Sequence, residues 1–197
     1  MRLSIFIGLV FLFSSCTSYP VLKQYDSSLE TIGEKEIKFE DGGTAKLANK
    51  KEGTTTLLLV RHAEKKKGGN DPQLTAKGSN RAVKLAQILE AFDIQKVYSS
   101  NYQRTLETAE PVLKSKGIGV EIYNPRELDK LKSRILKEDI GNNVLVVGHS
   151  NSTPTLANLF AGKDLFEKFD ESDYNNLLLL EFTKPEKVKA TRLFIKM

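Results

Sequence analysis

The chain is 197 residues long, with 40% hydrophobic and 28% charged residues and a formal net charge of +5. This length and balance indicate one globular domain with an additional tail, and they exclude an intrinsically disordered protein. The lysines are scattered, and the only short run, at 65–67, is typical of a solvated loop that can also steer an anionic substrate; nothing predicts nucleic-acid binding.

The first sixteen residues have the parts of a secretory signal peptide. Arg2 supplies a positive charge, residues 3–13 form an apolar stretch too short to span a bilayer, and Ser14 and Ser15 precede the expected cleavage point. The segment ends at Cys16, the only cysteine of the chain, which therefore has no partner for an internal disulfide.

The position of Cys16 resembles the end of a bacterial lipoprotein signal, in which the cysteine becomes the acylated first residue of the mature chain. The bulky Phe13 departs from the usual pattern of such signals. The alternative is an ordinary signal peptide in which the cysteine has no role. The lipoprotein interpretation predicts an extracytoplasmic protein of a bacterial cell envelope, anchored to a membrane by lipid chains on Cys16 without spanning it.

Residues 17–53 are polar and weakly patterned, and we expect them to form a tether. Within this stretch, Glu36–Phe39 is a candidate short strand before a turn at 41–43. The pattern changes at residue 54, which predicts a folded domain over residues 54–197.

From residue 54 onwards, apolar strand-like runs alternate with amphipathic helical segments. Thr75 is a candidate N-cap, Pro111 a candidate kink and Gly117 a candidate C-cap. The alternation indicates an α/β fold, a three-layer α/β/α sandwich with a mostly parallel sheet and one antiparallel edge strand from the final pair around a turn at 184–186. The expected strands cover 54–62, 96–100, 119–123, 143–150, 176–182 and 188–195, and the expected helices cover 74–92, 102–117, 125–139 and 152–162.

The two histidines of the chain, His62 and His149, each lie at the carboxyl end of an expected strand. Ligands of open α/β sheets bind in the crevice outside the carboxyl ends of the strands. Arg61 adjoins His62, and Arg104 lies on the first helical turn after another strand. We therefore expect two arginines and two histidines to meet in one pocket.

Such a pocket suits a phosphoryl group. Two guanidinium groups offer forked donors that match phosphate oxygens, and the turn with Ser150 and Asn151 leads into a helix whose N–H groups favour an anion. These two side chains could instead only cap that helix. One imidazole can act as a nucleophile, and the second, when protonated, can stabilise the transferring group. Two histidines without a nearby cysteine make a poor zinc site, so no metal is expected.

Four segments, in order, resemble the motifs of the histidine phosphatase superfamily, which includes the phosphoglycerate mutases. The resemblance covers roughly residues 55–197 and implies a phosphoglycerate mutase-like fold. The segments are LVRHAEK with its Arg-His signature, DPQLTAKGSNRA with Leu-Thr-x-x-Gly, YSSNYQRTLETAEP with Ser-x-x-x-Arg-x-x-x-Thr, and VVGHSNSTP with Gly-His.

The resemblance implies a role for each matching residue. His62 would be the nucleophile that becomes phosphorylated, and His149 would be the second histidine of the pocket. Arg61 and Arg104 would bind the phosphoryl oxygens. Water would then hydrolyse the phosphohistidine, with no metal or organic cofactor.

The proton donor is where the sequence departs from the family's fuller pattern, which places an acidic residue after the second arginine. Glu127 has a suitable position but a different local sequence, and it could instead belong to the first turn of a helix. Glu64 and Asp71 are further candidates near His62. The shortest family members, which include bacterial phosphohistidine protein phosphatases, lack an obvious acid. The sequence therefore favours a labile phosphoester or a phosphoramidate as the substrate.

Three functions remain open on the sequence. The first is a histidine acid phosphatase-type hydrolase of a small-molecule or protein-borne phosphate outside the cytoplasm. The second is a phosphoglycerate mutase-type transferase, which the export signal disfavours. The third is a non-catalytic phosphate-binding envelope lipoprotein, favoured by the missing acid and disfavoured by the complete pocket. The loops at 65–73 and 163–175, from which specificity would come, carry no motif, and nothing predicts the oligomeric state.

Overall fold

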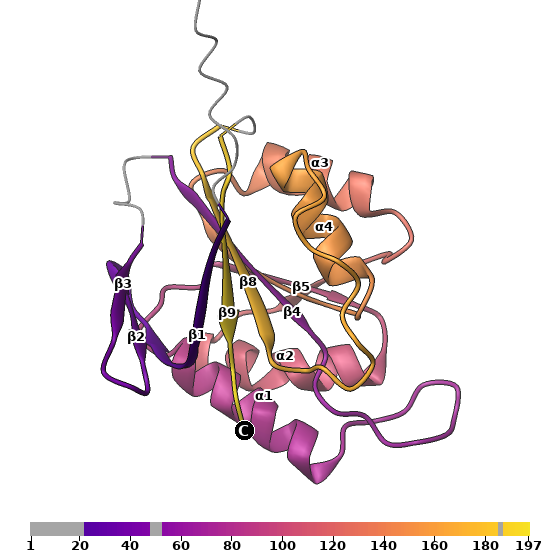
Figure 1. The fold of residues 1–197 in the computed structure, drawn as a ribbon. Coiled ribbons are helices and arrows are strands. Elements are labelled where there is room, and N and C mark those ends of the chain that lie inside the picture. Colours follow the sequence, from indigo (N-terminus) through magenta and orange to yellow (C-terminus); the bar gives the residue numbers. More distant parts are fainter. Residues whose placement is uncertain (1–21, 48–52, 185–186) are drawn as a thin grey trace, which may run out of the picture.

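A computed structural model describes residues 22–47, 53–184 and 187–197 (Figure 1). Within these ranges, nine strands form one sheet in the order β3-β2-β1-β9-β8-β4-β7-β5-β6, and four helices flank it. The elements are β1 (Leu22–Ile32), β2 (Glu36–Phe39), β3 (Thr44–Lys46), β4 (Thr55–Arg61), α1 (Ala76–Ile88), β5 (Lys96–Ser100), α2 (Gln103–Lys116), β6 (Val120–Tyr123), α3 (Leu128–Glu138), β7 (Asn143–Gly148), α4 (Ser152–Ala161), β8 (Asn176–Phe182) and β9 (Lys189–Phe194).

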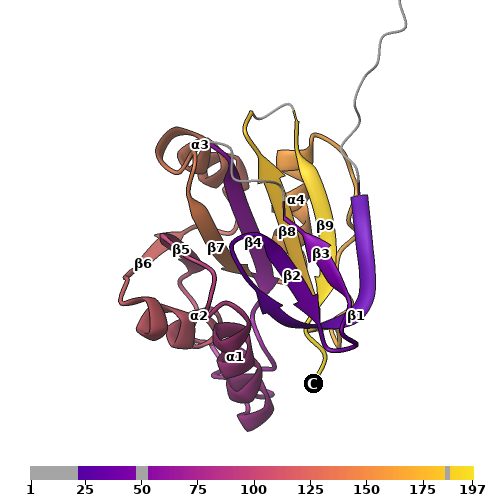
Figure 2. The same cartoon turned by 90° about the vertical axis from the view of Figure 1, so that its left-hand side faces the viewer.

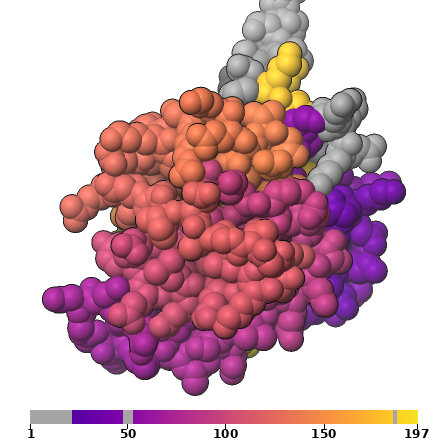
Figure 3. Space-filling view, turned by 180° about the vertical axis from the view of Figure 1, so that it is seen from behind, coloured from indigo at the N-terminus to yellow at the C-terminus, as the bar shows by residue number. Residues whose placement is uncertain are grey.

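The helices lie on both sides of the sheet, so the predicted three-layer α/β/α arrangement is confirmed. Helices α1 and α2 lie on one side and α3 and α4 on the other (Figures 1 and 2). Alternate residues of β4 belong to the two cores: Leu58 and Val60 pack with the α1 and α2 side, while Leu57 and Leu59 pack with the α3 and α4 side. In the view from behind (Figure 3), residues from the middle of the chain, coloured magenta to orange, form most of the surface, and the indigo N-terminal residues show only at one side.

The central strands β4 and β7 are buried along their whole length, because both of their faces are covered. All seven residues of β4 and all six of β7 are buried, and the two strands pair in parallel from Thr56 with Asn143 to Arg61 with Gly148. Continuous apolar runs are typical of parallel strands that are buried on both faces. This pairing places the carboxyl ends of β4 and β7 side by side.

The helix ends follow the predicted signals at Thr75 and Gly117, but two boundaries differ, because α1 already ends at Ile88, before the predicted end at residue 92, and α3 starts late. Thr75 caps α1, with its hydroxyl accepting from the backbone N–H of Gly78 at 3.1 Å, and Gly117 ends α2 with a φ of 66°. Pro111 lies inside α2. Helix α3 begins three residues later than predicted, because residues 124–127 form a turn in which the N–H of Glu127 donates to the carbonyl of Asn124 at 3.0 Å.

One detail of the predicted sheet is different. The antiparallel strand β8 does not lie at an edge but between β4 and β9, antiparallel to both. The segment 163–175, which we call the return segment, leads from α4 back to the edge where β4 and β7 end, and β8 therefore starts at that edge. Phe166 and Phe169 of the return segment are buried in the core on the α3 and α4 side.

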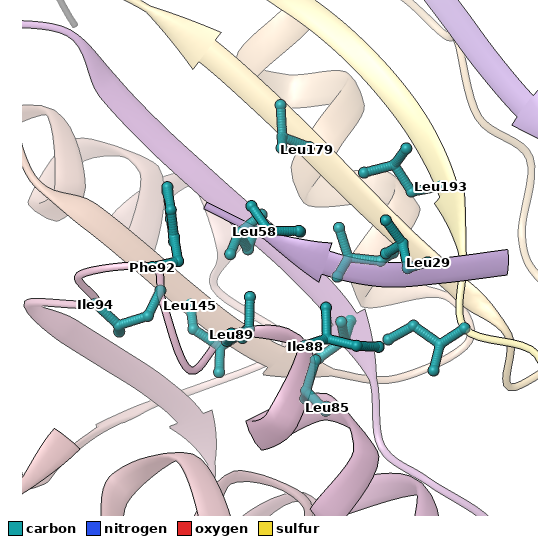
Figure 4. Close-up of a cluster of buried hydrophobic side chains, with 14 of the residues drawn as sticks. Leu29, Leu58, Leu85, Ile88, Leu89, Phe92, Ile94, Leu145, Leu179 and Leu193 are labelled. Carbon is teal, nitrogen blue, oxygen red and sulfur yellow. The ribbon is translucent and has the colours of Figure 1, made fainter. Parts of the chain in front are cut away.

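The predicted tether over residues 17–53 is wrong for residues 22–47, which form β1, β2 and β3. Only the candidate strand Glu36–Phe39 was expected there, and it is present as β2. The first half of β1 pairs in parallel with β9, and its second half pairs with β2. Leu29 and Ile32 are fully buried, and Figure 4 shows Leu29 close to Leu85 and Ile88 of α1. The sequence signal was weak because the first half of β1 is largely solvent-exposed and polar.

The predicted signal peptide, Cys16 and part of the predicted turn at 184–186 lie outside the described residues. Within the described residues, the search for a helix of the length and hydropathy needed to cross a membrane finds none.

Candidate active site

The residues singled out in the sequence meet at the carboxyl edge of the sheet. Arg61 ends β4 and His62 follows it, while His149 follows the end of β7. The backbone N–H of His62 donates to the carbonyl of Gly148 at 2.9 Å, which fixes the two strand ends to each other. Arg104 comes from the first turn of α2. They line a pocket of about 320 Å³ together with Lys65, Tyr102, Pro125, Arg126, Ser150, Asn151 and Glu171.

The ring of His62 is buried and is oriented by a hydrogen bond to its own neighbour. Its Nδ1 lies 2.7 Å from the carbonyl oxygen of Ala63. A carbonyl can only accept, so Nδ1 carries the proton and Nε2 keeps its lone pair. Burial lowers the pKa of His62 to about 3, an effect that the Ala63 carbonyl opposes and the charge of Arg61 reinforces. The neutral imidazole therefore offers Nε2 as a nucleophile well below neutral pH.

The second histidine lies across the pocket from the first. The ring centroids of His62 and His149 are 5.6 Å apart, and the planes are at 69°. Nε2 of His149 lies 2.9 Å from Oγ of Ser100, and Nδ1 lies 3.4 Å from Nη2 of Arg104. Burial and then the charges of Arg104 and Arg61 lower its pKa to about 4. His149 is therefore neutral at neutral pH, whereas the stabilising role considered for it in the sequence requires its protonated form.

Ser100 determines the proton position on His149. The hydroxyl of Thr105 donates to the carbonyl of Ser100 at 2.7 Å, so the Ser100 hydroxyl donates to Oγ of Thr105 at 3.1 Å. Oγ of Ser100 then accepts from Nε2–H of His149, which leaves Nδ1 as an acceptor facing Arg104. Ser100 was not singled out in the sequence, although it is the first residue of the Ser-x-x-x-Arg-x-x-x-Thr block.

The guanidinium group of Arg61 makes hydrogen bonds through Nη1 and Nη2 but, within the described residues, none through Nε. Its Nη1 donates to the carbonyls of Asp170, Glu171 and Asp173 at 2.9–3.1 Å, and its Nη2 donates to the carboxylate of Glu171 at 2.9 Å. Its Nε is buried and has no hydrogen-bond partner among the described residues. An Nε–H and the neighbouring Nη–H form the fork that matches two oxygens of a phosphate.

Arg104 has the same arrangement. Its Nη1 lies 3.5 Å from the carboxylate of Asp71, and its Nε is likewise buried without a partner in the described part of the chain. Each guanidinium lies over an aromatic ring: Arg61 is 4.2 Å from the ring centre of Tyr174, and Arg104 is 4.4 Å from that of Tyr102. Such stacking fixes the plane of a guanidinium, so the two unpaired Nε–H groups have defined directions.

Ser150 and Asn151 lie where the pocket meets the beginning of α4. Asn151 is the N-cap residue, but its side chain makes no capping hydrogen bond. The Ser150 hydroxyl donates to Oε1 of Glu171 at 2.9 Å. Both residues line the pocket, where the positive end of the α4 dipole favours an anion.

The prediction of Glu127 as the proton donor does not agree with the structure. Its carboxylate accepts from Asn124 Nδ2 at 3.1 Å and pairs with Lys130, and it does not line the pocket. The hydrogen bond from Lys130 lowers its pKa, which is the opposite of what a general acid needs. The residue before it, Arg126, lines the pocket instead.

The two other acidic candidates are also paired elsewhere. Both carboxylate oxygens of Glu64 accept from Arg81, at 2.8 and 2.9 Å. Asp71 accepts from the backbone N–H of Gln103 at 3.0 Å, next to Arg104. Neither lines the pocket.

Glu171 is the acidic residue of the pocket lining, and the sequence interpretation missed it. It comes from the return segment, and its pKa is lowered by the hydrogen bond from Ser150 and by the charge of Arg61. No motif marks it, and only the reversal of direction before β8 brings it to the site. Among the described residues there is no group of three or more His, Cys, Asp or Glu side chains placed to hold a metal ion.

Comparison with known families gives one match. Residues 57–129 match the model of the histidine phosphatase superfamily (branch 1). This stretch includes Arg61, His62 and Arg104, and it ends before His149. No curated protein matches the chain.

Solved structures share the fold over most of their length. The protein histidine phosphatase SixA, solved with tungstate, has a TM-score of 0.58 at 15% identity, over 71% of this chain and 97% of its own. The putative phosphohistidine phosphatase SixA from Nakamurella multipartitia has a TM-score of 0.52 at 23% identity, over 74% and 96%. A mycobacterial glucosyl-3-phosphoglycerate phosphatase has 0.56 at 14% identity, over 71% and 97%.

At these identities the structural likeness shows the fold, which is that of the phosphoglycerate mutase-like proteins. The family match adds the segment that carries the first histidine and both arginines. The His149 turn, which lies beyond the matched segment, completes the same pocket. Residues 57–129 are thus similar to the histidine phosphatase superfamily (branch 1), and the described fold is that of phosphoglycerate mutase-like structures.

Proposed function

We propose that the protein is a phosphatase that hydrolyses a phosphate monoester or a phosphoramidate through a phosphohistidine on His62, without a metal. The observation that carries the proposal is the pair of buried Nε–H groups on Arg61 and Arg104, which have no hydrogen-bond acceptor among the described residues, beside a neutral imidazole that carries its proton on Nδ1. A phosphoryl group would supply the missing acceptors.

The reaction would proceed in two displacements. Nε2 of His62 attacks phosphorus while the bond from phosphorus to the leaving group breaks, and the leaving group takes the electron pair. Water then attacks the phosphohistidine, the P–Nε2 bond breaks, and inorganic phosphate is released. The arginines and the N–H groups at the start of α4 would stabilise the charge on the transferring oxygens in both steps.

The pocket favours leaving groups that depart without a strong general acid. The acidic residue of its lining, Glu171, is ion-paired with Arg61 and has a lowered pKa, so it is a poor proton donor near neutral pH. Phosphoramidates, acyl phosphates and aryl phosphates have such leaving groups. The fold shared with proteins described as phosphohistidine phosphatases supports this choice of substrate class.

Hydrolysis of p-nitrophenyl phosphate and of phosphohistidine by the full chain in detergent tests the proposal. Activity should persist in a chelator, fall at least about 1,000-fold in His62→Ala, and stay unchanged in Glu127→Gln as a matched control. Acid-labile ³²P should be retained by the wild type and lost in His62→Ala. Activity no greater than that of His62→Ala, on both substrates, would refute the phosphatase function.

We further propose that Cys16 carries lipid chains that anchor the protein to a bacterial envelope membrane. The proposal is supported by the apolar segment before Cys16 and by the position of the chain's only cysteine at its end. A Cys16→Ser variant should leave the membrane fraction, whereas a Ser18→Ala control should remain there. A Cys16→Ser chain that stays with the membrane would exclude a lipid anchor at this residue.

A further inference from the structure

Two cations of the pocket lining have no partner in the described structure. Lys65 and Arg126 are exposed, line the pocket, and make no side-chain ion pair or hydrogen bond with any described residue. The other two cations of the lining differ from them, because Arg61 is paired with Glu171 and Arg104 lies beside Asp71.

The backbone at Lys65 is fixed on the loop between β4 and α1. Lys65 forms a bridge with Leu74 across the base of this loop, which projects from the molecule in Figure 1. The preceding residue, Glu64, is held by Arg81 and accepts from the backbone N–H of Thr75 at 2.8 Å. The Lys65 side chain therefore starts from a rigid point beside His62.

The backbone at Arg126 is fixed on a different loop, between β6 and α3. Its N–H donates to Oδ1 of Asn124 at 3.1 Å, and the Asn124 amide also donates to Glu127. These hydrogen bonds within the turn hold its backbone in place. Both cations reach one pocket from separate, anchored loops, whereas Lys66 and Lys130 are paired with Gln73 and Glu127.

The positive charge of the pocket lining is larger than the charge that would neutralise a phosphoryl dianion. Four cationic side chains and one carboxylate line it, so its formal charge is +3 with both histidines neutral. A phosphoryl dianion bound by Arg61 and Arg104 would leave one positive charge of this lining uncompensated. That excess lies on Lys65 and Arg126, outside the position expected for the phosphoryl group.

We infer that Lys65 and Arg126 form a subsite for a second oxyanion, a carboxylate or phosphate, carried by the leaving group of the substrate. The inference rests on the proposed phosphatase function and narrows its substrates to those whose leaving group is itself anionic. Substrates with a neutral leaving group are bound only through the phosphoryl group.

A matched pair of substrates tests the subsite: 4-carboxyphenyl phosphate and its neutral amide, 4-carbamoylphenyl phosphate. The wild type should favour the carboxylate in kcat/KM by about 10-fold at low salt, and the preference should shrink in high salt. Lys65→Gln and Arg126→Gln should each reduce the ratio by about 3-fold, and the double variant should bring it close to one. Turnover of the amide should fall less than turnover of the carboxylate in these variants, because the amide carries no second anion for Lys65 and Arg126.

Two control variants separate a local effect from general charge. Lys67→Gln lies on the same loop and Lys130→Gln on α3, and neither residue lines the pocket, so both should keep the wild-type ratio. Thermal unfolding of all variants checks that they are folded. A wild-type ratio near one, or a ratio that the double variant leaves unchanged, would overturn the subsite.

Failure of the proposed function can be distinguished from failure of the subsite. Calorimetric binding of the same two compounds to His62→Ala reports the ratio without turnover. Hydrolysis of both compounds with no preference contradicts the subsite alone. Preferential binding of the carboxylate without hydrolysis by the wild type contradicts the phosphatase function and supports the subsite.

Discussion

At the scale of single residues, Arg61 depends on the return segment more than on its own strand. Three carbonyls and one carboxylate of residues 170–173 hold one side of its guanidinium, and Tyr174 lies against its face. None of these groups bonds to Nε–H, which has no partner among the described residues. The carboxylate of Glu171 is also the negative charge of the pocket lining.

Replacing Glu171 with Gln should strengthen the binding of phosphate. The substitution removes a negative charge 2.9 Å from Arg61 and keeps an acceptor for Ser150, so inorganic phosphate should bind about 5-fold more tightly. Competitive inhibition by phosphate or direct calorimetry measures the change. Glu167→Gln, on the same segment but outside the pocket lining, is the control. Weaker phosphate binding would mean that the charge of Glu171 is needed to hold Arg61.

Sequence reasoning found the residues that follow strand ends and missed those that depend on tertiary contacts. His62, His149 and Arg104 could be placed because their distance from a strand end was readable. The predicted role of Glu127 as proton donor was wrong, because the turn that contains Glu127 directs its carboxylate to Lys130. Glu171 could not be found, since its position depends on a long segment without periodicity.

At the scale of elements, the junction between β4 and α1 has no space for an added methyl group. A Cβ on Gly78 would lie 2.2 Å from the carbonyl oxygen of Glu64. That carbonyl cannot move freely, because Thr75 donates to it and Arg81 holds the Glu64 side chain. The first turn of α1 is thus packed directly against the segment that follows His62.

Gly78→Ala should therefore lower the free energy of unfolding by roughly 1–3 kcal/mol, although alanine favours a helix. Gly119→Ala is the matched control, since a Cβ there meets nothing within 4 Å, and its stability should stay within about 0.5 kcal/mol. Urea unfolding of both variants measures the difference. A Gly78→Ala variant as stable as the wild type would show that the Glu64 backbone can yield.

A second prediction at this scale concerns strand β1, which belongs to the folded domain and not to a tether. Leu29 is fully buried against the core on the α1 side, and Leu29→Ala should cost about 2–5 kcal/mol of unfolding free energy. Leu22, on the same strand, is 42% exposed, and Leu22→Ala should change stability by less than about 0.5 kcal/mol. Equal, small effects at both positions would contradict the packing of β1.

The elements from β4 onwards were predictable because their periodicities are strong. Runs buried on both faces gave β4, β7 and β8, and capping residues gave the start of α1 and the end of α2. Strand β1 was not predictable, since it has few apolar positions and its partner β9 is at the other end of the chain. The direction of β8 likewise could not be predicted, because it depends on the return segment leading the chain back to the edge of the sheet where β4 and β7 end.

At the scale of the whole molecule, the fold keeps both histidines neutral, and this links stability to pH. Their pKa values are about 3 and about 4 in the folded protein, against an ordinary value of 6.5 in the unfolded chain. The unfolded chain therefore binds more protons below pH 6.5, and the free energy of unfolding falls as the pH decreases through that value. The chain has only these two histidines, and no other side chain ordinarily titrates between pH 7 and 5.

Lowering the pH from 7 to 5 should cost roughly 2 kcal/mol for His62 and less for His149, which is partly exposed. Urea unfolding at the two pH values measures the loss. The double variant His62→Gln/His149→Gln should show almost none of it. A wild type with equal stability at both pH values would contradict the burial of neutral imidazoles.

The direction in which β1 enters the sheet has a consequence for how an anchored protein meets its substrate. Leu22 lies in register, through Ala190 and Leu180, with Leu57, four residues before Arg61 on β4. Because β1 runs parallel to β4, the chain enters from the end of the sheet opposite the pocket. Only residues 17–21 separate Cys16 from Leu22, so the distance between these two residues is at most about 22 Å even when the chain is fully extended. If the protein is anchored through Cys16 as proposed, the domain would therefore lie close to the lipid surface, with the opening of its pocket facing the aqueous side. It would then bind phosphorylated molecules from solution and not from the bilayer to which it is attached.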